Sequence, residues 1–278
     1  MTTTTPTVGA APERKGRRRT TPIPVGILAT IGVAFLLIPL AGLLLRTPWT
    51  RLPELLTSPA ALEALRLSLI CSVGATALAI VIGVPLAWVL ARAHLPGRTA
   101  IRALVTLPLV LPPVVGGVAL LLAFGRRGLV GQYLYDWFGV QLPFSTAGVI
   151  IAEAFVAMPF LIITVEGALR SADPRYEEAA ATLGAGRWVI FRRVTMPLIA
   201  PALIAGTVLA WARALGEFGA TITFAGNLPG VTQTLPLAVY SALNTDRDAA
   251  IALSLVLLVA SLAVLILLRG RYLRGGAS

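Results

Sequence analysis

Residues 177 to 197 read EEAAATLGAGRWVIFRRVTMP and lie between two apolar segments, each long enough to cross a lipid bilayer. The stretch contains two glutamates, three arginines and two glycines. Because a charged side chain in the hydrocarbon core costs about 2.5–3.5 kcal/mol, this stretch is expected to lie outside the lipid. Its alanine-rich first half and its terminal proline predict short helices in a loop between two membrane spans.

The composition of the whole chain predicts a membrane protein. Hydrophobic residues make up 57% of the 278 residues, charged residues make up 13%, and the mean hydropathy is +0.86. A helix needs about 20 mostly apolar residues to span the hydrocarbon, where every backbone amide must be bonded within the protein. The predicted fold is therefore all-α, a polytopic helical bundle.

Six apolar segments are long enough to span the membrane. They are residues 25–45, 67–91, 103–124, 147–165, 198 to about 225, and 249–268. The fourth contains Glu153 and the fifth contains Arg213 and Glu217, so these charges are expected to face protein or water. Prolines inside the segments predict kinks at Pro39, Pro85, Pro108, Pro112 and Pro113.

The distribution of basic residues predicts the orientation of the spans. With the N-terminus in the cytoplasm, sixteen of the 23 Lys and Arg fall in cytoplasmic segments and six fall outside. Cytoplasmic loops retain Lys and Arg, so both termini and the loop 174–197 are expected in the cytoplasm. Residues 1–24 form a basic tail and residues 25–278 the membrane domain. The first span lacks a following A-x-A cleavage site and is expected to be retained.

The charge distribution and the scarcity of Cys and His argue against several other functions. The net charge of +11 and the cluster ERKGRRR at residues 13–19 do not require a nucleic-acid partner, because positive-inside bias and anionic lipid headgroups account for them. Cys71 and His94 are the only residues of their kinds, which predicts no metal site and no catalytic cluster. No cofactor is expected, and the chain is not expected to be an enzyme.

ATP hydrolysis by this chain is also excluded by the sequence. A P-loop requires a lysine followed by Ser or Thr, whereas the sole lysine, Lys15, lies in the tail. If ATP drives transport here, another polypeptide must supply the nucleotide site.

The loop 174–197 is expected to form a helix, a turn and a second helix. Pro174 can start a helix that RYEEAAATL continues, and Gly184 ends it. A second short helix, residues 187–194, is expected to stop before Pro197, which opens the next span. Such a loop can present a docking surface to a partner, or its helices can simply lie along the membrane interface.

The spacing of this loop resembles the EAA loop of ABC importer permeases. That pattern reads E-A-A, three residues, G, nine residues, I-x-L-P, and here it is matched by Glu178, Ala179, Ala180 and Gly184, followed by VTMP at 194–197. Val and Met replace the Ile and Leu of the pattern. The resemblance implies coupling helices that dock on a separate ATPase subunit, and thus six coupling positions: Glu177, Glu178, Ala179, Ala180, Gly184 and Ala185.

A second stretch, WARALGEFGATITFAGNLPGVTQTLPLAVYSAL at residues 211–243, resembles molybdate permeases. Sulfate and thiosulfate permeases share the core A-R-A-x-G-E-F-G-A, while TITFAGNLPGVTQTLP is closer to the molybdate branch. The resemblance implies a type I permease fold in a bacterial or archaeal plasma membrane. The implied partners are ABC ATPase subunits, an extracytoplasmic oxyanion-binding protein and a second permease copy in a homodimer. Molybdate or tungstate is the expected substrate of an ATP-driven importer, and the alternatives are a sulfate/thiosulfate ABC permease or a stand-alone anion channel or carrier.

Arg213, Glu217 and Thr221 are spaced four residues apart and are expected on one face of the fifth span. Two roles remain open for them. Arg213 and Glu217 can form an internal ion pair that orients the helix, or Arg213 can supply positive potential along an anion path while Glu217 holds its side chain. Glu153 and Glu166 are expected to be interfacial or to pair helices, and the polar segment 227–236 to line the outer mouth or meet the binding protein.

Overall fold

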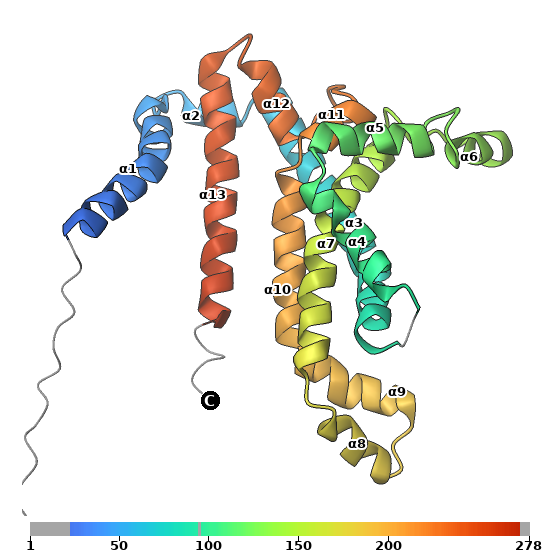
Figure 1. The fold of residues 1–278 in the computed structure, drawn as a ribbon. Coiled ribbons are helices and arrows are strands. Elements are labelled where there is room, and N and C mark those ends of the chain that lie inside the picture. Colours follow the sequence, from blue (N-terminus) through green and yellow to red (C-terminus); the bar gives the residue numbers. More distant parts are fainter. Residues whose placement is uncertain (1–22, 94–95, 273–278) are drawn as a thin grey trace, which may run out of the picture. The chain divides into compact units, whose positions relative to one another are not determined.

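The computed structural model describes residues 23–93 and 96–272, which are helical with no β-strand among them. The basic tail up to residue 22 and His94 lie outside this part. The predicted all-α class is confirmed (Figure 1). The elements are α1 (Ile23–Arg46), α2 (Leu52–Leu56), α3 (Pro59–Arg92), α4 (Arg98–Val110), α5 (Pro113–Phe124), α6 (Gly131–Phe138), α7 (Thr146–Ser171), α8 (Arg175–Thr182), α9 (Arg187–Ile190), η1 (Phe191–Thr195, a π-helix), α10 (Met196–Leu215), α11 (Gly219–Phe224), α12 (Leu235–Ala242) and α13 (Arg247–Tyr272).

The chain forms two compact units, residues 1–45 and residues 46–278. Helix α1 makes up the described part of the first unit and is apolar along its whole length, with Pro39 inside it. Its 23 residues from Pro24 to Arg46 are long enough to cross a bilayer, and none of them is buried within the structure. A helix that is apolar on every side is suited to lipid or to other apolar helices.

Among the described residues, five helices are long and apolar enough to span a membrane, and the bent pair α4–α5 brings the number to six if it counts as one span. The predicted third span, residues 103–124, is thus not one continuous helix, because the chain bends by 120° between Val110 and Pro113. Leu111 and Pro112 both precede a proline and both adopt extended backbone angles. A following proline disfavours the helical conformation, so two in succession end α4 and start α5 in a new direction.

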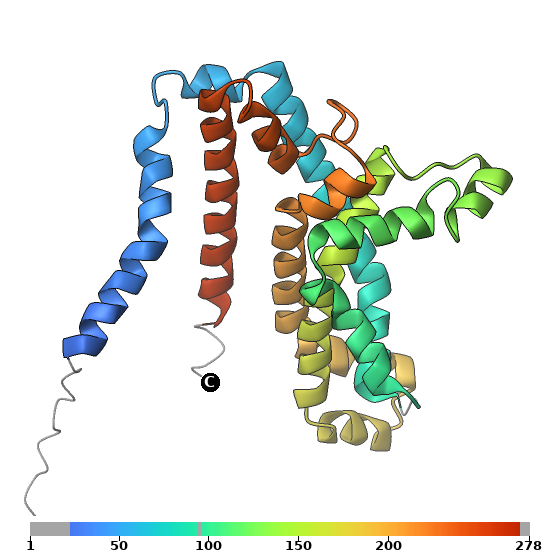
Figure 2. The same cartoon turned by 45° about the horizontal axis from the view of Figure 1, so that its top comes forward.

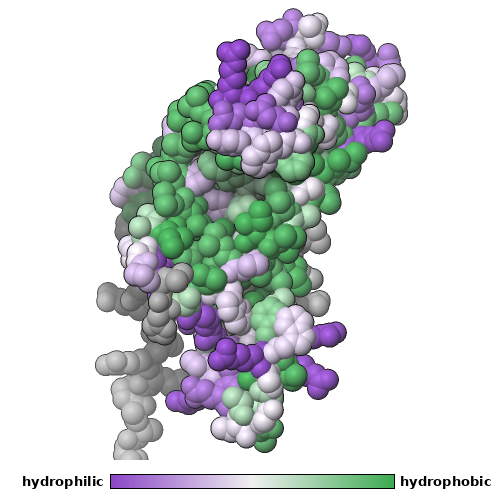
Figure 3. All heavy atoms as spheres, turned by 90° about the vertical axis from the view of Figure 1, so that its right-hand side faces the viewer, coloured by the Kyte–Doolittle hydropathy of each residue, from purple (hydrophilic) through white to green (hydrophobic). Residues whose placement is uncertain are grey.

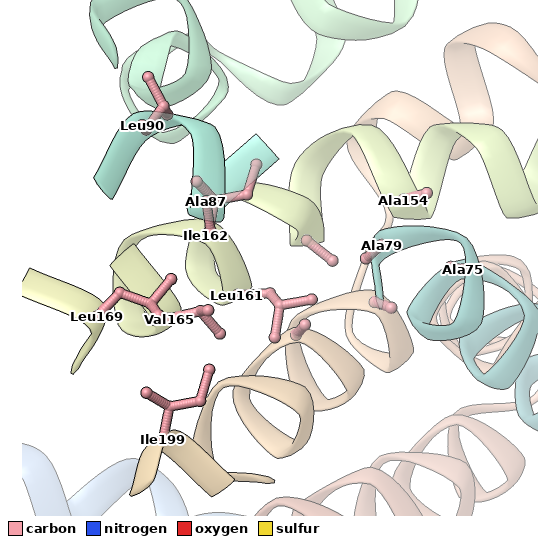
Figure 4. Packing of buried hydrophobic residues seen from close by; sticks show 13 residues of the cluster. Ala75, Ala79, Ala87, Leu90, Ala154, Leu161, Ile162, Val165, Leu169 and Ile199 are labelled. Carbon is pink, nitrogen blue, oxygen red and sulfur yellow. The ribbon is translucent and has the colours of Figure 1, made fainter. Parts of the chain in front are cut away.

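The core of the second unit lies where α3, α7 and α10 pack along one another, side by side in Figures 1 and 2. Small residues dominate the contact on α3, where Ala75, Ala79 and Ala87 are fully buried. Figure 4 shows Ala87 beside the larger Ile162 of α7. Lipid tails are as apolar as leucine, so these helices associate through close van der Waals packing, which small residues permit.

Helices α5 and α11 also approach closely, toward the end of the bundle opposite α8 and α9 (Figure 1). A Cβ atom on Gly117 would lie 2.6 Å from Cβ of Thr223, and one on Gly219 would lie 2.7 Å from Cβ of Pro113. Neither distance is tolerated by real side chains, so the two glycines are required for this contact.

The second unit has two opposite ends. In Figure 1, α12, α2 and the start of α13 lie at one end, and α8 and α9 lie at the other. The face in Figure 3 carries a hydrophobic band between hydrophilic ends, as expected for a protein that spans a bilayer. The loop that contains α8 and α9 is therefore placed beyond one edge of the membrane.

Candidate functional site

The loop 174–197 begins with the predicted helix and glycine turn. Pro174 is the N-cap of α8, and the carboxylate of Asp173 accepts a hydrogen bond of 3.0 Å from the backbone N–H of Arg175. Gly184 follows the C-cap Leu183 and has a φ of +81°. The N–H of Ala185 donates to the carbonyl of Ala180 over 3.0 Å, a Schellman arrangement that satisfies the last carbonyls of the helix. The predicted role of Gly184 as helix terminator is confirmed.

The sequence predicted that the second helix of the loop would stop before Pro197, and this prediction is wrong. The helix continues from α9 through the π-helical segment η1 into α10, so that one helical stretch extends from Arg187 to Leu215. Proline has no N–H to donate, and in a regular α-turn its ring would clash with the carbonyl four residues earlier. The wider π-turn ends at Thr195, two residues before Pro197, and lets the helix continue.

The six predicted coupling residues divide into two groups by exposure. Glu178, Ala179 and Gly184 are exposed, whereas Glu177, Ala180 and Ala185 are half-buried against the rest of the protein. The spacing of 177 and 180 places both on the same side of α8. Only the first group is therefore freely available to a partner.

Large apolar side chains are exposed on this loop, which lies outside the hydrophobic band. The exposed fraction is 89% for Leu183, 69% for Trp188 and 61% for Tyr176. Trp188 stacks on Phe191, with ring centroids 5.5 Å apart. Exposed apolar surface rimmed by charged residues is typical of a protein–protein contact.

The half-buried Glu177 contacts two other elements. Its Oε1 atom accepts hydrogen bonds from Nη2 of Arg92, in the last turn of α3, and from Oγ1 of Thr195, at the end of η1, both over 2.9 Å. Sequence reasoning did not identify Arg92 as a functional residue. The only signal available was opposite charge in two segments that each adjoin the end of a span.

The fifth span contains the second candidate site, and its predicted geometry needs correction. Helix α10 ends at Leu215, and a break separates it from α11, so Arg213, Glu217 and Thr221 do not share one helical face. Gly216 caps the first helix and Gly219 begins the second. Glycine lowers helix propensity on both sides of Glu217, which accounts for the break.

The internal ion pair itself is present in this broken segment. Nη2 of Arg213 lies 2.7 Å from Oε2 of Glu217, whose side chain is 1% exposed, against 29% for Arg213. The other carboxylate oxygen, Oε1, accepts a 2.8 Å hydrogen bond from the backbone N–H of Ala220 at the start of α11. Glu217 thus fixes Arg213 and caps the next helix at the same time.

Two further buried polar groups lie near this pair. Thr221 is fully buried, and its hydroxyl has no hydrogen-bond partner among the described residues. Glu153 on α7 is 1% exposed rather than interfacial, and its Oε2 atom also has no partner in the described part of the chain. Polar groups therefore gather inside the half of the bundle that lies away from α8 and α9.

Other polar residues connect elements of the fold. Glu166 on α7 accepts a 3.0 Å hydrogen bond from Nε of Arg102 on α4, so its predicted helix-pairing role is confirmed. In the loop between α11 and α12, Asn227 and Gln233 hydrogen-bond to each other and both bond to Ser241. These amides are thus engaged within the protein. No cluster of metal-binding side chains occurs among the residues that the structure describes.

Comparison with known proteins identifies relatives over most of the chain. The family model described as "Binding-protein-dependent transport system inner membrane component" matches residues 79–273. The chain is 50% identical over 238 residues to the molybdenum transport system permease protein ModB of Mycobacterium bovis, covering 86% of this chain and 90% of that one. It is 44% identical to ModB of Escherichia coli K12 over 211 residues, covering 76% and 92%.

Sulfate permeases and a solved transporter match less closely. The identity to the sulfate transport system permease protein CysT of Escherichia coli K12 is 38% over 234 residues, which covers 83% of this chain and 84% of that one. The crystal structure of a bacterial ABC transporter involved in alginate import matches with a TM-score of 0.69 and 21% identity, covering 90% of this chain and 94% of that one. This structural match supports the fold.

Proposed function

The chain belongs to the binding-protein-dependent transport system inner membrane components, and from this premise we propose that it is the permease subunit of an ATP-driven molybdate importer. The observation that carries the substrate assignment is the 50% identity to a molybdenum permease, against 38% to a sulfate permease, over nearly the same length. The family and the molybdate branch predicted from the EAA loop and from residues 211–243 are both confirmed. Tungstate, a tetrahedral dianion like molybdate, is the proposed second substrate.

The loop 174–197 is the proposed docking element for a separate ATPase subunit. Its exposed residues Glu178, Ala179 and Gly184, and the exposed apolar Leu183 and Trp188, supply charge and contact area for that partner. When two ATPases close on ATP, the loops of two permease copies move together and switch the path from inward-facing to outward-facing. The chain itself performs no covalent chemistry.

The translocation path is proposed to follow the broken fifth span. Arg213 is 29% exposed, while Glu217 is buried and holds its guanidinium. A cation fixed in this way supplies positive potential for a passing dianion without closing around it, since release to the cytoplasm requires weak binding. Thr221, whose hydroxyl has no partner among the residues that the structure describes, is the nearby hydrogen-bond donor that the same path can use.

A complete importer requires further subunits. The family description names binding-protein dependence, and a second solved alginate transporter is in complex with a substrate-bound periplasmic protein. We therefore include an extracytoplasmic oxyanion-binding protein on the outer face and a second copy of this chain in a homodimer. Basic residues concentrated near the α8–α9 end support a cytoplasmic position for that end and for both termini.

The substrate assignment is tested by competition. The permease, its ATPase and its binding protein are reconstituted in vesicles, and uptake of labelled molybdate is measured with rising sulfate. Uptake should persist in a large excess of sulfate and fall with equimolar tungstate. Equal competition by sulfate and molybdate would assign the chain to the sulfate branch.

A further inference from the structure

Glu177 precedes the E-A-A residues of the coupling loop and is turned toward the membrane helices. One of its carboxylate oxygens, Oε1, accepts hydrogen bonds of 2.9 Å from both Arg92 and Thr195. These partners belong to different elements, because Arg92 lies in the last turn of α3 and Thr195 is the last residue of η1. A single atom thus joins the coupling helix α8 to two membrane helices.

The three residues are held in place by their surroundings. Thr195 is completely buried, and the side chains of Arg92 and Glu177 are each 25% exposed. The Nε atom of Arg92 has no hydrogen-bond partner among the described residues, so Glu177 is the carboxylate that fixes this guanidinium. Isolated ion pairs at partial exposure contribute little to folding stability. The main effect of these charge-assisted hydrogen bonds is therefore to fix the position of α8 relative to α3 and η1.

The two residues bonded to Glu177 belong to segments that extend into the bundle. Helix α3 packs along α7 and α10 through the alanine-rich core. Segment η1 continues directly into α10, and the Arg213–Glu217 pair begins in the last turn of that helix. A displacement of α8 therefore reaches the candidate path through two rigid helices.

We propose that Glu177 is a positioning residue, which links the coupling helix to α3 and to η1 so that movement of the docked ATPase is transmitted to both helices. The proposal rests on the proposed function, because it assumes that an ATPase docks on α8. It differs from the role implied by family resemblance, in which Glu177 would be part of the docking surface. The exposed Glu178 remains on that surface.

The link is tested with the complete importer in proteoliposomes, by measuring molybdate ions imported per ATP hydrolysed. Glu177→Ala should lower this ratio by about fivefold or more, the range typical of coupling between sites. The ATPase should stay bound to the permease and continue to hydrolyse ATP. Trp88 and Phe191, whose rings meet edge to face at 5.1 Å, still join α3 to η1 in this variant and preserve the fold.

Asp173→Asn is the matched control. Asp173 is exposed, lies four residues before Glu177 and makes no ion pair in the part of the chain that is described. Asparagine keeps the oxygen that accepts the N–H of Arg175, so this change removes only a charge. The import ratio of Asp173→Asn should equal that of the wild type.

A charge reversal separates a positioning role from a docking role. In Glu177→Arg combined with Arg92→Glu, the ion pair re-forms with opposite polarity, and the hydroxyl of Thr195 can accept a hydrogen bond. This double variant should recover most of the lost ratio, whereas each single reversal should not. Loss of ATPase binding in Glu177→Ala, or a wild-type ratio in that variant, would overturn the proposal. The wild-type complex is measured first, so that absence of any ATP-driven uptake counts against the proposed function instead.

Discussion

Replacing Glu217 by leucine is expected to destabilise the permease through two separate losses. The change leaves the guanidinium of Arg213 without the carboxylate that lies 2.7 Å away, and it leaves the N–H of Ala220 without its 2.8 Å acceptor. Removing one partner of a buried ion pair costs about 3–5 kcal/mol. Because Arg213 is 29% exposed and can reach water in part, the lower end of that range, about 3 kcal/mol, is expected.

Glu217→Gln separates the two losses. Glutamine removes the charge but keeps an amide oxygen that can accept the N–H of Ala220, and an unsatisfied buried N–H costs about 1–3 kcal/mol. The glutamine variant is therefore expected to be less destabilised than the leucine variant, by about 1 kcal/mol or more. The free energy of unfolding is measured on the purified permease in mixed micelles, by circular dichroism during titration with a denaturing detergent.

The exposed Glu54, on α2, provides the control for loss of a glutamate. Glu54→Gln should change the free energy of unfolding by no more than about 0.5 kcal/mol. If Glu217→Leu were as stable as the wild type, the ion pair would not hold the broken span together. If the glutamine and leucine variants were equally unstable, the hydrogen bond to Ala220 would make no contribution.

Three further predictions concern the close helix contact and the coupling loop. Gly117→Ala should lower the free energy of unfolding by about 1–3 kcal/mol, because its Cβ would lie 2.6 Å from that of Thr223. The control is Gly167→Ala, which has no atom within 4 Å of the added Cβ and should raise the free energy of unfolding by about 0.5–1 kcal/mol. Gly184→Ala should strain the turn by about 1–2 kcal/mol, because φ is +81° at this position. A pull-down titration should then show weaker ATPase binding, and unchanged binding would show that the turn does not shape the docking surface. A cysteine introduced at Glu178 should react with a membrane-impermeant maleimide only from the cytoplasmic side, and bound ATPase should protect it. The buried Cys71 should stay unlabelled. Labelling of the introduced cysteine from outside would reverse the proposed orientation.

The fold class and the membrane spans were predictable because they depend on properties averaged over many residues. An apolar segment of about 20 residues must form a helix in lipid whatever its neighbours are. The helix terminator at Gly184 was predictable for a local reason, since a left-handed backbone there favours glycine. Composition and local propensity were sufficient for these features.

The breaks within spans were harder to predict. Pro112 and Pro113 indicated a kink, but the sequence did not indicate a bend of 120°. The apolar residues after Glu217 suggested a continued helix, although Gly216 and Gly219 end α10 and begin α11. Breaks of this kind depend on which neighbouring groups satisfy the freed backbone, as Glu217 does for Ala220.

The inward position of Glu177 could not be inferred from the EAA spacing. That spacing begins at Glu178 and does not specify Glu177, and the half-buried Glu177 and the exposed Glu178 lie on different sides of α8. Which side faces the bundle is set by Arg92, which is 85 residues away in the sequence. Contacts over such separations depend on tertiary packing and have no local sequence signal.

The central claim is that this chain imports molybdate only with a motor supplied by another polypeptide. The most direct measurement compares uptake of labelled molybdate into proteoliposomes that contain either the permease alone or the permease with its ATPase and binding protein, each with and without ATP. Uptake is expected only with the complete assembly in the presence of ATP. Equal uptake by the permease alone, down a molybdate gradient and without ATP, would identify a channel or carrier and contradict the account.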